Sequence, residues 1–232
     1  MRVHVAFTPD EAGAAPTGIV IDVIRATTTM CQALASGYER VFCTAEVEEA
    51  RALRDALADG VLGGERNAVR IPGFDLGNSP REYLEPTGTT LILSTTNGTR
   101  AVVSAATRCE RVLVASLLNL SAVVETARAA NEDVIVVCAG VQGTLALDDA
   151  YVAGRIVELL AWERSDAAEA AARLTSTWSG AEEAFRASRS GSNLLENAPE
   201  LEDDIAFCAR ESVLDVVPRL AALRGGVAEI VK

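Results

Sequence analysis

Short apolar runs rich in Val and Ile alternate along the chain with longer segments rich in Ala, Leu, Glu and Arg. The short runs are typical of buried strands, and the longer segments are typical of helices. We expect strands at 2–7, 18–23, 40–43, 89–94, 111–115 and 133–138, and helices at 28–36, 47–58, 99–106 and 121–130. This alternation predicts an α/β protein with a three-layer α/β/α fold and a mostly parallel sheet.

Two stretches, at about 18–60 and 89–131, resemble each other when Val41 is placed opposite Val112. Each is predicted to contain a strand, a polar turn, a helix, a second strand and a second helix. This pattern predicts an internal duplication of a β-turn-α-β-α unit. The two polar turns would then lie near each other at the carboxyl edge of one sheet, where open α/β sheets bind ligands.

The chain after residue 141 is mostly helical in pattern. We expect helices at 147–162, 167–175 and 181–187, followed by a polar break at 188–193. No linker rich in Pro or Ser divides the chain, so we expect a single domain over residues 1–232.

The composition restricts the class of protein. The chain has 232 residues, of which 49% are hydrophobic, enough to bury a sizeable core. A net charge of −12 argues against a nucleic-acid partner, and no apolar stretch is long enough to span a membrane. The start lacks a signal-peptide pattern, and five cysteines in mostly apolar surroundings indicate buried thiols. We therefore expect a cytoplasmic protein, and the sequence leaves a homo-oligomer open.

Three absences restrict the chemistry. Lys232 is the only lysine, which effectively excludes Schiff-base chemistry and a Walker-type phosphate loop. His4 is the only histidine, and a place on a strand face is its simpler interpretation. No cysteine is followed six residues later by arginine, so the cysteine-phosphatase loop is missing. The polar chemistry must come from Asp, Glu, Arg, Asn, Ser and Thr.

The first candidate motif covers residues 21–29. An apolar strand ends at Asp22, and a helix opens with three threonines, of which Thr27 and Thr28 are the first. Free backbone N–H groups and the helix dipole favour an anion there, Arg25 adds a positive charge, and Asp22 could hold Mg²⁺. Helix capping is the alternative, but it needs only one such residue.

The second candidate motif covers residues 94–100, in the corresponding turn of the repeat. Asn97 and Gly98 would ordinarily signal a hairpin, but a helical pattern follows, so the glycine favours close approach of the backbone to a ligand. Thr99 supplies a hydroxyl, and Arg100 supplies a guanidinium group.

The third candidate motif is a glycine-rich loop that runs from 63–66 to 73–80. Ser79 has the pattern of a capping box with Pro80 and Glu82, which is the alternative to a binding role. That alternative leaves Glu65, Arg66 and Asn78 unexplained, and long loops inside compact domains are usually functional.

Two smaller signals lie further along the chain. Asn119 is expected at the start of a helix, where capping alone could explain it. Asp148 and Asp149 open a later helix, and the helix dipole or a metal would each account for them equally well.

Four motifs together resemble the 2-phosphosulfolactate phosphatase family. They are Asp-Val-Ile-Arg-Ala-Thr-Thr-Thr at 22–29, Gly-Glu-Arg at 64–66, Gly-Phe-Asp-Leu-Gly-Asn-Ser-Pro at 73–80 and Thr-Thr-Asn-Gly-Thr-Arg at 95–100. The resemblance covers roughly residues 18–154 and extends more weakly to 190–218. It implies Mg²⁺-dependent hydrolysis of (2R)-2-phospho-3-sulfolactate to 3-sulfolactate and phosphate, which in methanogens belongs to coenzyme M biosynthesis.

Phosphate-monoester hydrolysis needs a metal and positive side chains to neutralise charge on the transferring phosphoryl group. We therefore expect a small anionic phosphorylated substrate and Mg²⁺. The expected catalytic residues are Asp22, Arg25, Glu65 and Arg100, and the expected metal ligands are Asp22, Glu65, Asp148 and Asp149. The expected substrate-binding residues are Thr27, Thr28, Arg66, Asn78, Ser79, Asn97, Gly98, Thr99 and Asn119.

The sequence leaves two questions open. Asp22 could attack phosphorus directly or hold a metal that activates water. The same turns could also serve a Mg²⁺-dependent phosphatase of another small phosphorylated carboxylic acid, or a non-catalytic anion-binding protein.

Overall fold

One sheet of eleven strands runs through the described chain, which comprises residues 1–57 and 59–232 of the computed structural model. The strand order is β5-β4-β6-β3-β11-β10-β7-β2-β8-β1-β9. Six of the strand pairings are parallel and four are antiparallel, so the predicted mostly parallel sheet is confirmed. The strands are β1 (Arg2–Ala6), β2 (Ala15–Ile21), β3 (Arg40–Thr44), β4 (Gly60–Arg66), β5 (Val69–Arg70), β6 (Thr90–Ser94), β7 (Cys109–Ala115), β8 (Val134–Cys138), β9 (Glu163–Arg164), β10 (Arg219–Arg224) and β11 (Val227–Val231).

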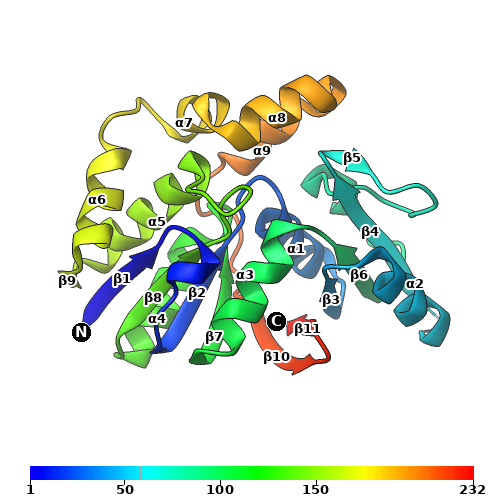
Figure 1. Ribbon diagram of the computed structural model, residues 1–232, viewed down its shortest axis with the longest axis horizontal. Coiled ribbons are helices and arrows are strands. Elements are labelled where there is room, and N and C mark those ends of the chain that lie inside the picture. The colour runs from blue at the N-terminus through cyan, green and yellow to red at the C-terminus, as the bar shows by residue number, and fades with distance from the viewer. Residues whose placement is uncertain (58) are drawn as a thin grey trace.

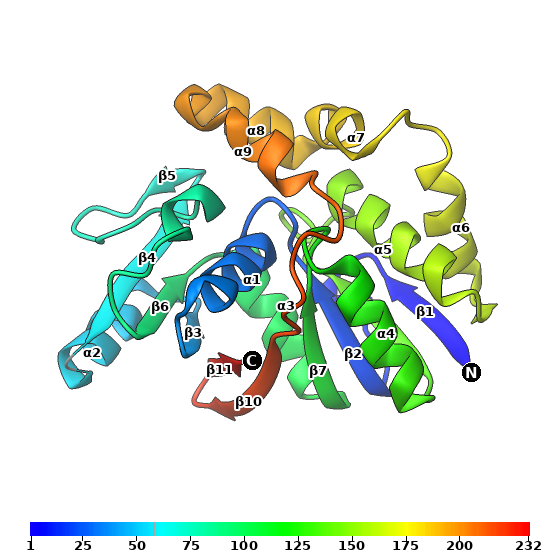
Figure 2. The ribbon, with the colours of Figure 1, turned by 180° about the vertical axis from the view of Figure 1, so that it is seen from behind.

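Helices cover both faces of the sheet, which gives the predicted three-layer α/β/α arrangement. Figure 1 shows α2 and α3 in front of the strands, and Figure 2 shows α1 and α4 in the view from behind. By packing, α1 and α3 share one apolar cluster, α4 and α5 share another, and α2 belongs to a third. The α-helices of the described residues are α1 (Ala26–Ser36), α2 (Val47–Ala56), α3 (Asn97–Ala106), α4 (Leu120–Ala130), α5 (Leu147–Leu160), α6 (Asp166–Thr175), α7 (Ala181–Ala187), α8 (Arg189–Asn197) and α9 (Asp203–Cys208). The expected helix at 47–58 ends at Ala56, and Ala58 lies outside the described residues.

The strands form the centre of the fold because both of their faces are apolar. In β2, Ile19 and Ile21 pack into a cluster with α4 and α5, whereas Val20 packs into a second cluster with α1 and α3. Successive side chains of a strand point to opposite faces, so a strand covered on both sides is apolar at every position. This is why the Val- and Ile-rich runs predicted the central strands correctly.

The predicted closeness of the two polar turns is confirmed, although their strands are not neighbours. Strands β2 and β6 are separated by β3, β11, β10 and β7. Helix α1 leads from β2 across to β3, and α3 leads from β6 back to β7. Gly98 in α3 is so close to the first turn that an added Cβ would lie 2.7 Å from Ala26 Cβ and 3.0 Å from Asp22 Oδ2.

The two segments of the proposed repeat contain the same order of elements. The first holds β2, α1, β3 and α2, and the second holds β6, α3, β7 and α4. The C-terminal hairpin of β10 and β11 pairs with β7 on one side and β3 on the other, between these two units. A duplication remains a prediction that this shared order favours.

Two sequence-based expectations about local structure are wrong. Residues 63–66 form part of strand β4 and not a loop, because β4 pairs with β6 in parallel from Gly60 to Gly64. The polar break at 188–193 is the start of helix α8, whose first turn is capped by the hydroxyl of Ser188. In both places the polar and glycine-rich sequence suggested an irregular segment. The pairing of β4 with β6 and the Ser188 cap of α8 instead produce a strand and a helix.

The five cysteines are free thiols, and four of them are buried, as the apolar surroundings predicted. Across residues 1–57 and 59–232, no helix combines the length and apolar character that crossing a membrane requires.

The close approach of β4 to β6 generates a stability prediction. Gly64 has a φ of +149°, and an added Cβ would overlap the carbonyl oxygen of Ser94. We expect Gly64→Ala to lower the free energy of unfolding by at least about 2 kcal/mol, through backbone strain and overpacking. Urea unfolding measures this loss. Gly13→Ala is the control, because an added Cβ there meets no atom within 4 Å; equal stability of both variants would contradict the prediction.

Candidate active site

A small pocket, called here the inner pocket, lies where the two polar turns meet. Its volume is about 90 Å³, well below the roughly 300–1,000 Å³ typical of pockets for drug-sized ligands. Five predicted site residues line it: Asp22, Arg25, Glu65, Asn78 and Asn97. Thr95 of the second motif also lines it, and Ser190 and Asn193 of α8 complete its polar lining. The pocket therefore joins all three sequence motifs with a helix from the C-terminal third.

Asp22 stands at the end of β2, and the first turn is built around it. Its Oδ1 accepts the backbone N–H of Ala26 (3.4 Å), and its carbonyl oxygen accepts the N–H of Thr27 (2.9 Å). The Thr27 hydroxyl accepts the N–H of Asp22, and the Thr28 hydroxyl donates to the carbonyl of Val23. Both threonines are fully buried and do not line the inner pocket, so in this structure they shape the turn.

Burial makes the ionised form of Asp22 costly. The pKa of this carboxyl is raised to about 7, first by burial and then by the negative charges of Asp148 and Glu65. The N–H of Ala26 and the charge of Arg25 oppose the rise. A carboxyl with a pKa near neutrality can both hold and release a proton at physiological pH, which is a property of catalytic acids and bases.

Asp148 and Asp149 lie behind Asp22 and do not line the inner pocket. Asp149 accepts the N–H of Val23 (2.9 Å) on one oxygen and the N–H of Gly140 (3.0 Å) on the other, which ties the end of β2 to the end of β8. Asp148 accepts the hydroxyl of Ser190 (3.0 Å), and burial raises its pKa to about 6. In this structure the pair supports the Asp22 turn from behind.

Arg25 is held on two sides. Its Nη1 donates to Asp204 Oδ2 (2.8 Å), and its Nη2 donates to the carbonyl of Ala68 (3.0 Å). Ser79 donates its hydroxyl to the other oxygen of Asp204 (2.6 Å), and it makes no capping bond to the 3₁₀-helix η2 (Pro80–Tyr83). The sequence motifs do not include Asp204, since nothing in its local pattern distinguishes it from the exposed acids nearby.

Asn78 presents a buried acceptor without a partner. Its backbone carbonyl accepts the hydroxyl of Thr29 (2.9 Å), but its side-chain Oδ1 has no hydrogen-bond partner among the described residues. A buried polar atom in this condition is costly unless a ligand or water pairs with it. Because Asn78 lines the inner pocket, a ligand there would supply the missing partner.

Glu65 and Arg66 are neighbours on β4 with different surroundings. Glu65 lines the inner pocket and accepts the N–H of Ala68 (2.8 Å) on Oε2. Arg66 lines neither cavity described here and donates to the carbonyls of Ala45 (2.6 Å) and Ser94 (3.3 Å). In this structure Arg66 therefore joins the ends of three strands.

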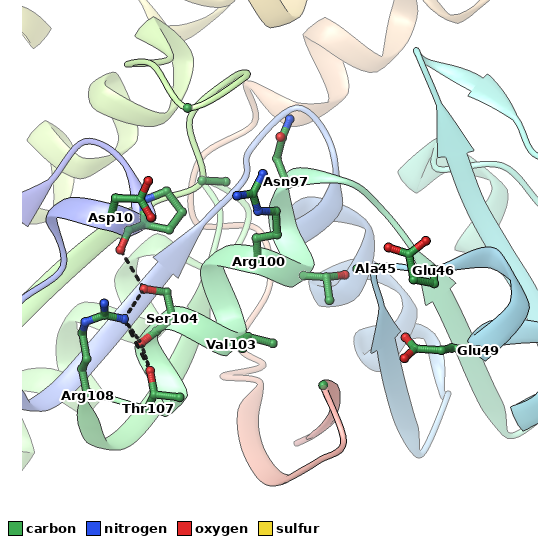
Figure 3. Close-up of a pocket in the computed structure, with 15 residues that line it drawn as sticks. Asp10, Ala45, Glu46, Glu49, Asn97, Arg100, Val103, Ser104, Thr107 and Arg108 are labelled. Carbon is green, nitrogen blue, oxygen red and sulfur yellow. Dashed lines mark hydrogen bonds between the residues drawn. The ribbon is translucent and has the colours of Figure 1, made fainter.

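A second, larger cavity of about 430 Å³ lies beside the inner pocket along α3 and is called here the outer cavity. Figure 3 shows Asn97 and Arg100 together on α3, with Glu46 and Glu49 on the opposite wall. Asn97 lines both cavities, whereas Arg100 lines only the outer one. Asp10 also lines the outer cavity, so the acidic residues of this cavity offset the charge of its arginines. The outer cavity is therefore less suited to a compact dianion than the inner pocket.

Two further predicted residues have structural partners. Thr99 lines the outer cavity and donates its hydroxyl to the carbonyl of Thr44 (3.0 Å). Asn119 lines neither cavity, and its amide donates to the carbonyls of Val114 (3.2 Å) and Val216 (3.0 Å). Its oxygen accepts the N–H of Ser116 instead of capping α4.

The donor set of the inner pocket suits a hard cation shared with a phosphate. Within the described residues, no three His, Cys, Asp or Glu side chains form a group that could hold a metal ion by themselves. Mg²⁺ is commonly bound through one or two carboxylates plus waters and substrate phosphate oxygens. Asp22, Glu65 and the unpaired Oδ1 of Asn78 are oxygen donors of this kind in one pocket.

Comparisons with known proteins agree with the motifs. Residues 5–222 match the family model described as 2-phosphosulpholactate phosphatase. A protein of Thermus thermophilus is 40% identical over 237 aligned positions, which cover 99% of this chain and 97% of the relative. A protein of Carboxydothermus hydrogenoformans is 37% identical, with coverage of 94% and 92%, and one of Thermotoga maritima is 39% identical, with coverage of 94% and 95%. Each carries the name probable 2-phosphosulfolactate phosphatase.

The raised pKa of Asp22 generates a prediction about stability and pH. Folded Asp22 keeps its proton up to about pH 7, whereas an unfolded aspartate loses it near about pH 3.9. The folded state therefore binds more protons between these values, and this carboxyl lowers the free energy of unfolding as the pH rises through that window. Asp22→Asn removes the contribution, so the variant should match the parent at low pH and become more stable than it toward pH 8.

Urea unfolding in EDTA at several values between roughly pH 4.5 and 8 measures this difference. Asp55→Asn is the control for an Asp-to-Asn substitution at an exposed position. Parallel stability profiles for Asp22→Asn and the parent would contradict the prediction.

Proposed function

The chain belongs to the 2-phosphosulfolactate phosphatase family, and on this premise we propose that it hydrolyses (2R)-2-phospho-3-sulfolactate to 3-sulfolactate and phosphate with the aid of Mg²⁺. The observation that carries the proposal is the inner pocket, where Asp22, Arg25 and Glu65 line one small space. These residues come from two of the motifs that resemble the family, and they supply the charges that phosphoryl transfer needs.

Arg25 is the residue best placed to bind the phosphoryl group. Its guanidinium is buried in the pocket wall, and charge-assisted hydrogen bonds to phosphate are strong in water-poor surroundings. Asn97 and Thr95, from the facing turn, offer an amide and a hydroxyl to the same space. In this arrangement the pocket orients the phosphate and excludes bulk water around it.

Asp22 is the proposed centre of the chemistry. With Glu65 and Asn78 Oδ1 it would hold Mg²⁺, which when bound neutralises charge on the phosphoryl oxygens and polarises the phosphorus. A direct attack by Asp22 on phosphorus is the second role that its position allows. Both roles use the ionised carboxylate, which a nearby cation would favour by lowering its pKa.

The setting of the reaction follows from charge and composition. A net charge of −12 disfavours nucleic-acid binding, and the small inner pocket suits a small phosphorylated acid, which we propose as the substrate. The free thiols favour a reducing compartment, and we propose the cytoplasm, with a role in sulfolactate metabolism and, in organisms that make it, coenzyme M biosynthesis.

A phosphate-release assay on a panel of phosphorylated acids tests the proposal. We expect 2-phosphosulfolactate to be hydrolysed, with activity lost in EDTA and restored by Mg²⁺. Loss of the sulfonate, as in 2-phospholactate, should lower kcat/KM by at least about tenfold, because the protein group that binds the sulfonate would be left unpaired.

Each result of this assay separates the alternatives. Equal kcat/KM for both substrates would favour a phosphatase of small phosphorylated carboxylic acids in general. Full activity of the metal-stripped protein would contradict the Mg²⁺ assignment. Binding of the panel without phosphate release would favour an anion-binding protein.

The two cavities predict different roles for two arginines. Arg25→Lys should lower kcat by about 10²–10³-fold, because lysine lacks the planar donor geometry that contacts several partners at once. Arg100→Lys should lower kcat less than about tenfold and act mainly on KM, since Arg100 is an exposed residue of the outer cavity.

Arg108→Lys is the matched control for steady-state kinetics on these variants. Arg108 lines the same outer cavity as Arg100, but its Nη1 donates to the hydroxyl (2.8 Å) and the carbonyl (3.2 Å) of Ser104. We expect near-parental activity for it. Equal losses of kcat in Arg25→Lys and Arg100→Lys would instead assign Arg100 to the phosphoryl group.

A further inference from the structure

We propose that Asp204 of α9 is a positioning residue that orients the guanidinium group of Arg25 in the inner pocket. This proposal rests on the proposed function, and it gives the C-terminal third of the chain a part in the active site. Asp204 does not line the pocket itself, so it would act only through Arg25.

The contact between the two residues is buried and charged. The side chains of Arg25 and Asp204 are only 3% and 0% exposed, and their Nη1 and Oδ2 atoms are 2.8 Å apart. The second oxygen of Asp204 accepts the Ser79 hydroxyl at 2.6 Å, so both oxygens of the carboxylate have a fixed partner. The Ser79 hydroxyl thus fixes the orientation of the Asp204 carboxylate, and this carboxylate in turn orients the Arg25 guanidinium group.

The remaining donors of Arg25 make this orientation useful. A guanidinium group has five N–H donors in one plane. Within the described residues, one is used by Asp204 and one by the carbonyl of Ala68. These two hydrogen bonds fix the plane of the guanidinium group. The remaining N–H donors of Arg25, which lines the inner pocket, therefore point in fixed directions. Pre-organised donors of this kind stabilise phosphoryl charge without reorganising during the reaction.

Stability alone does not explain this ion pair. The desolvation of two buried charges cancels much of their attraction, and well-packed apolar residues are often at least as stabilising. A buried arginine beside a pocket, however, needs a counter-charge to remain in place when no anion is bound. Asp204, which does not line the pocket, supplies that charge.

The next residue along the chain provides a matched control. Asp203 pairs with Arg81 of η2 at 3.2 Å, so α9 makes a second ion pair with a different partner. The Asp203 pair is solvent-exposed, with side chains 41% and 78% exposed, and neither residue lines the inner pocket. Asp203→Asn therefore removes an ion pair of the same helix without touching Arg25.

The test compares Asp204→Asn with Asp203→Asn in steady-state kinetics on 2-phosphosulfolactate and in calorimetric binding of inorganic phosphate. For folded Asp204→Asn we expect kcat/KM to fall by about 10- to 100-fold, the cost of a misplaced catalytic group, with weaker phosphate binding. Asp203→Asn should keep the parental values of both. Parental kinetics and phosphate affinity in folded Asp204→Asn would overturn the proposal.

A double-substitution cycle separates positioning from a purely structural role. If Asp204 acts through Arg25, Arg25→Gln and the double variant Arg25→Gln/Asp204→Asn should have the same kcat/KM within about twofold. The double variant leaves no unpaired buried charge, so this comparison remains available if Asp204→Asn alone fails to fold. A further tenfold loss in the double variant would overturn the proposal. Absence of phosphatase activity in the parent would refute the proposed function instead, and phosphate binding would still test Asp204.

Discussion

The burial of a negative charge at the meeting point of two turns is the constraint on which the site depends. Asp22 ends β2 directly beside the N-terminus of α3, where Gly98 leaves just enough room for its carboxylate. Burial and the nearby acids raise its pKa to about 7, so its charge is stable only when positive groups or N–H donors approach it. The carboxylate is stabilised by the N–H of Ala26, by the charge of Arg25 and, in the proposed reaction, by a cation.

The groups around Asp22 are themselves buried and need polar partners, and these partners lie far along the chain. Arg25 is buried beside Asp22 and therefore needs Asp204, which belongs to a helix near the C-terminus. Asp149 fixes the backbone behind Asp22 by joining Val23 to Gly140, and Asp148 reaches Ser190 in α8. The last third of the chain is thus tied to a turn near the N-terminus by buried polar contacts.

Local sequence predicts the parts of this structure that depend on local pattern. The central strands and the helices up to residue 187 follow from apolar runs and helical segments, because burial on both faces leaves a clear signal. Strand β4 was hidden by its glycines, which permit close packing on β6, and α8 was hidden by its polar residues. Of the site, the motifs predicted Asp22, Arg25, Glu65, Asn78 and Asn97 in one pocket. The motifs do not predict Asp204, whose partners are far away in sequence.

The same contacts explain why such a site is not built for stability. Asp22, Asp148 and Asp149 are buried acids whose pKa values are all raised, so each makes folding less favourable near neutral pH. The unpaired Oδ1 of Asn78 adds a second unfavourable feature in the same pocket. Both features would be relieved by a cation, which stabilises the carboxylates and pairs with Oδ1, and not by closer packing. The energetic cost of these buried groups therefore favours the proposed cation.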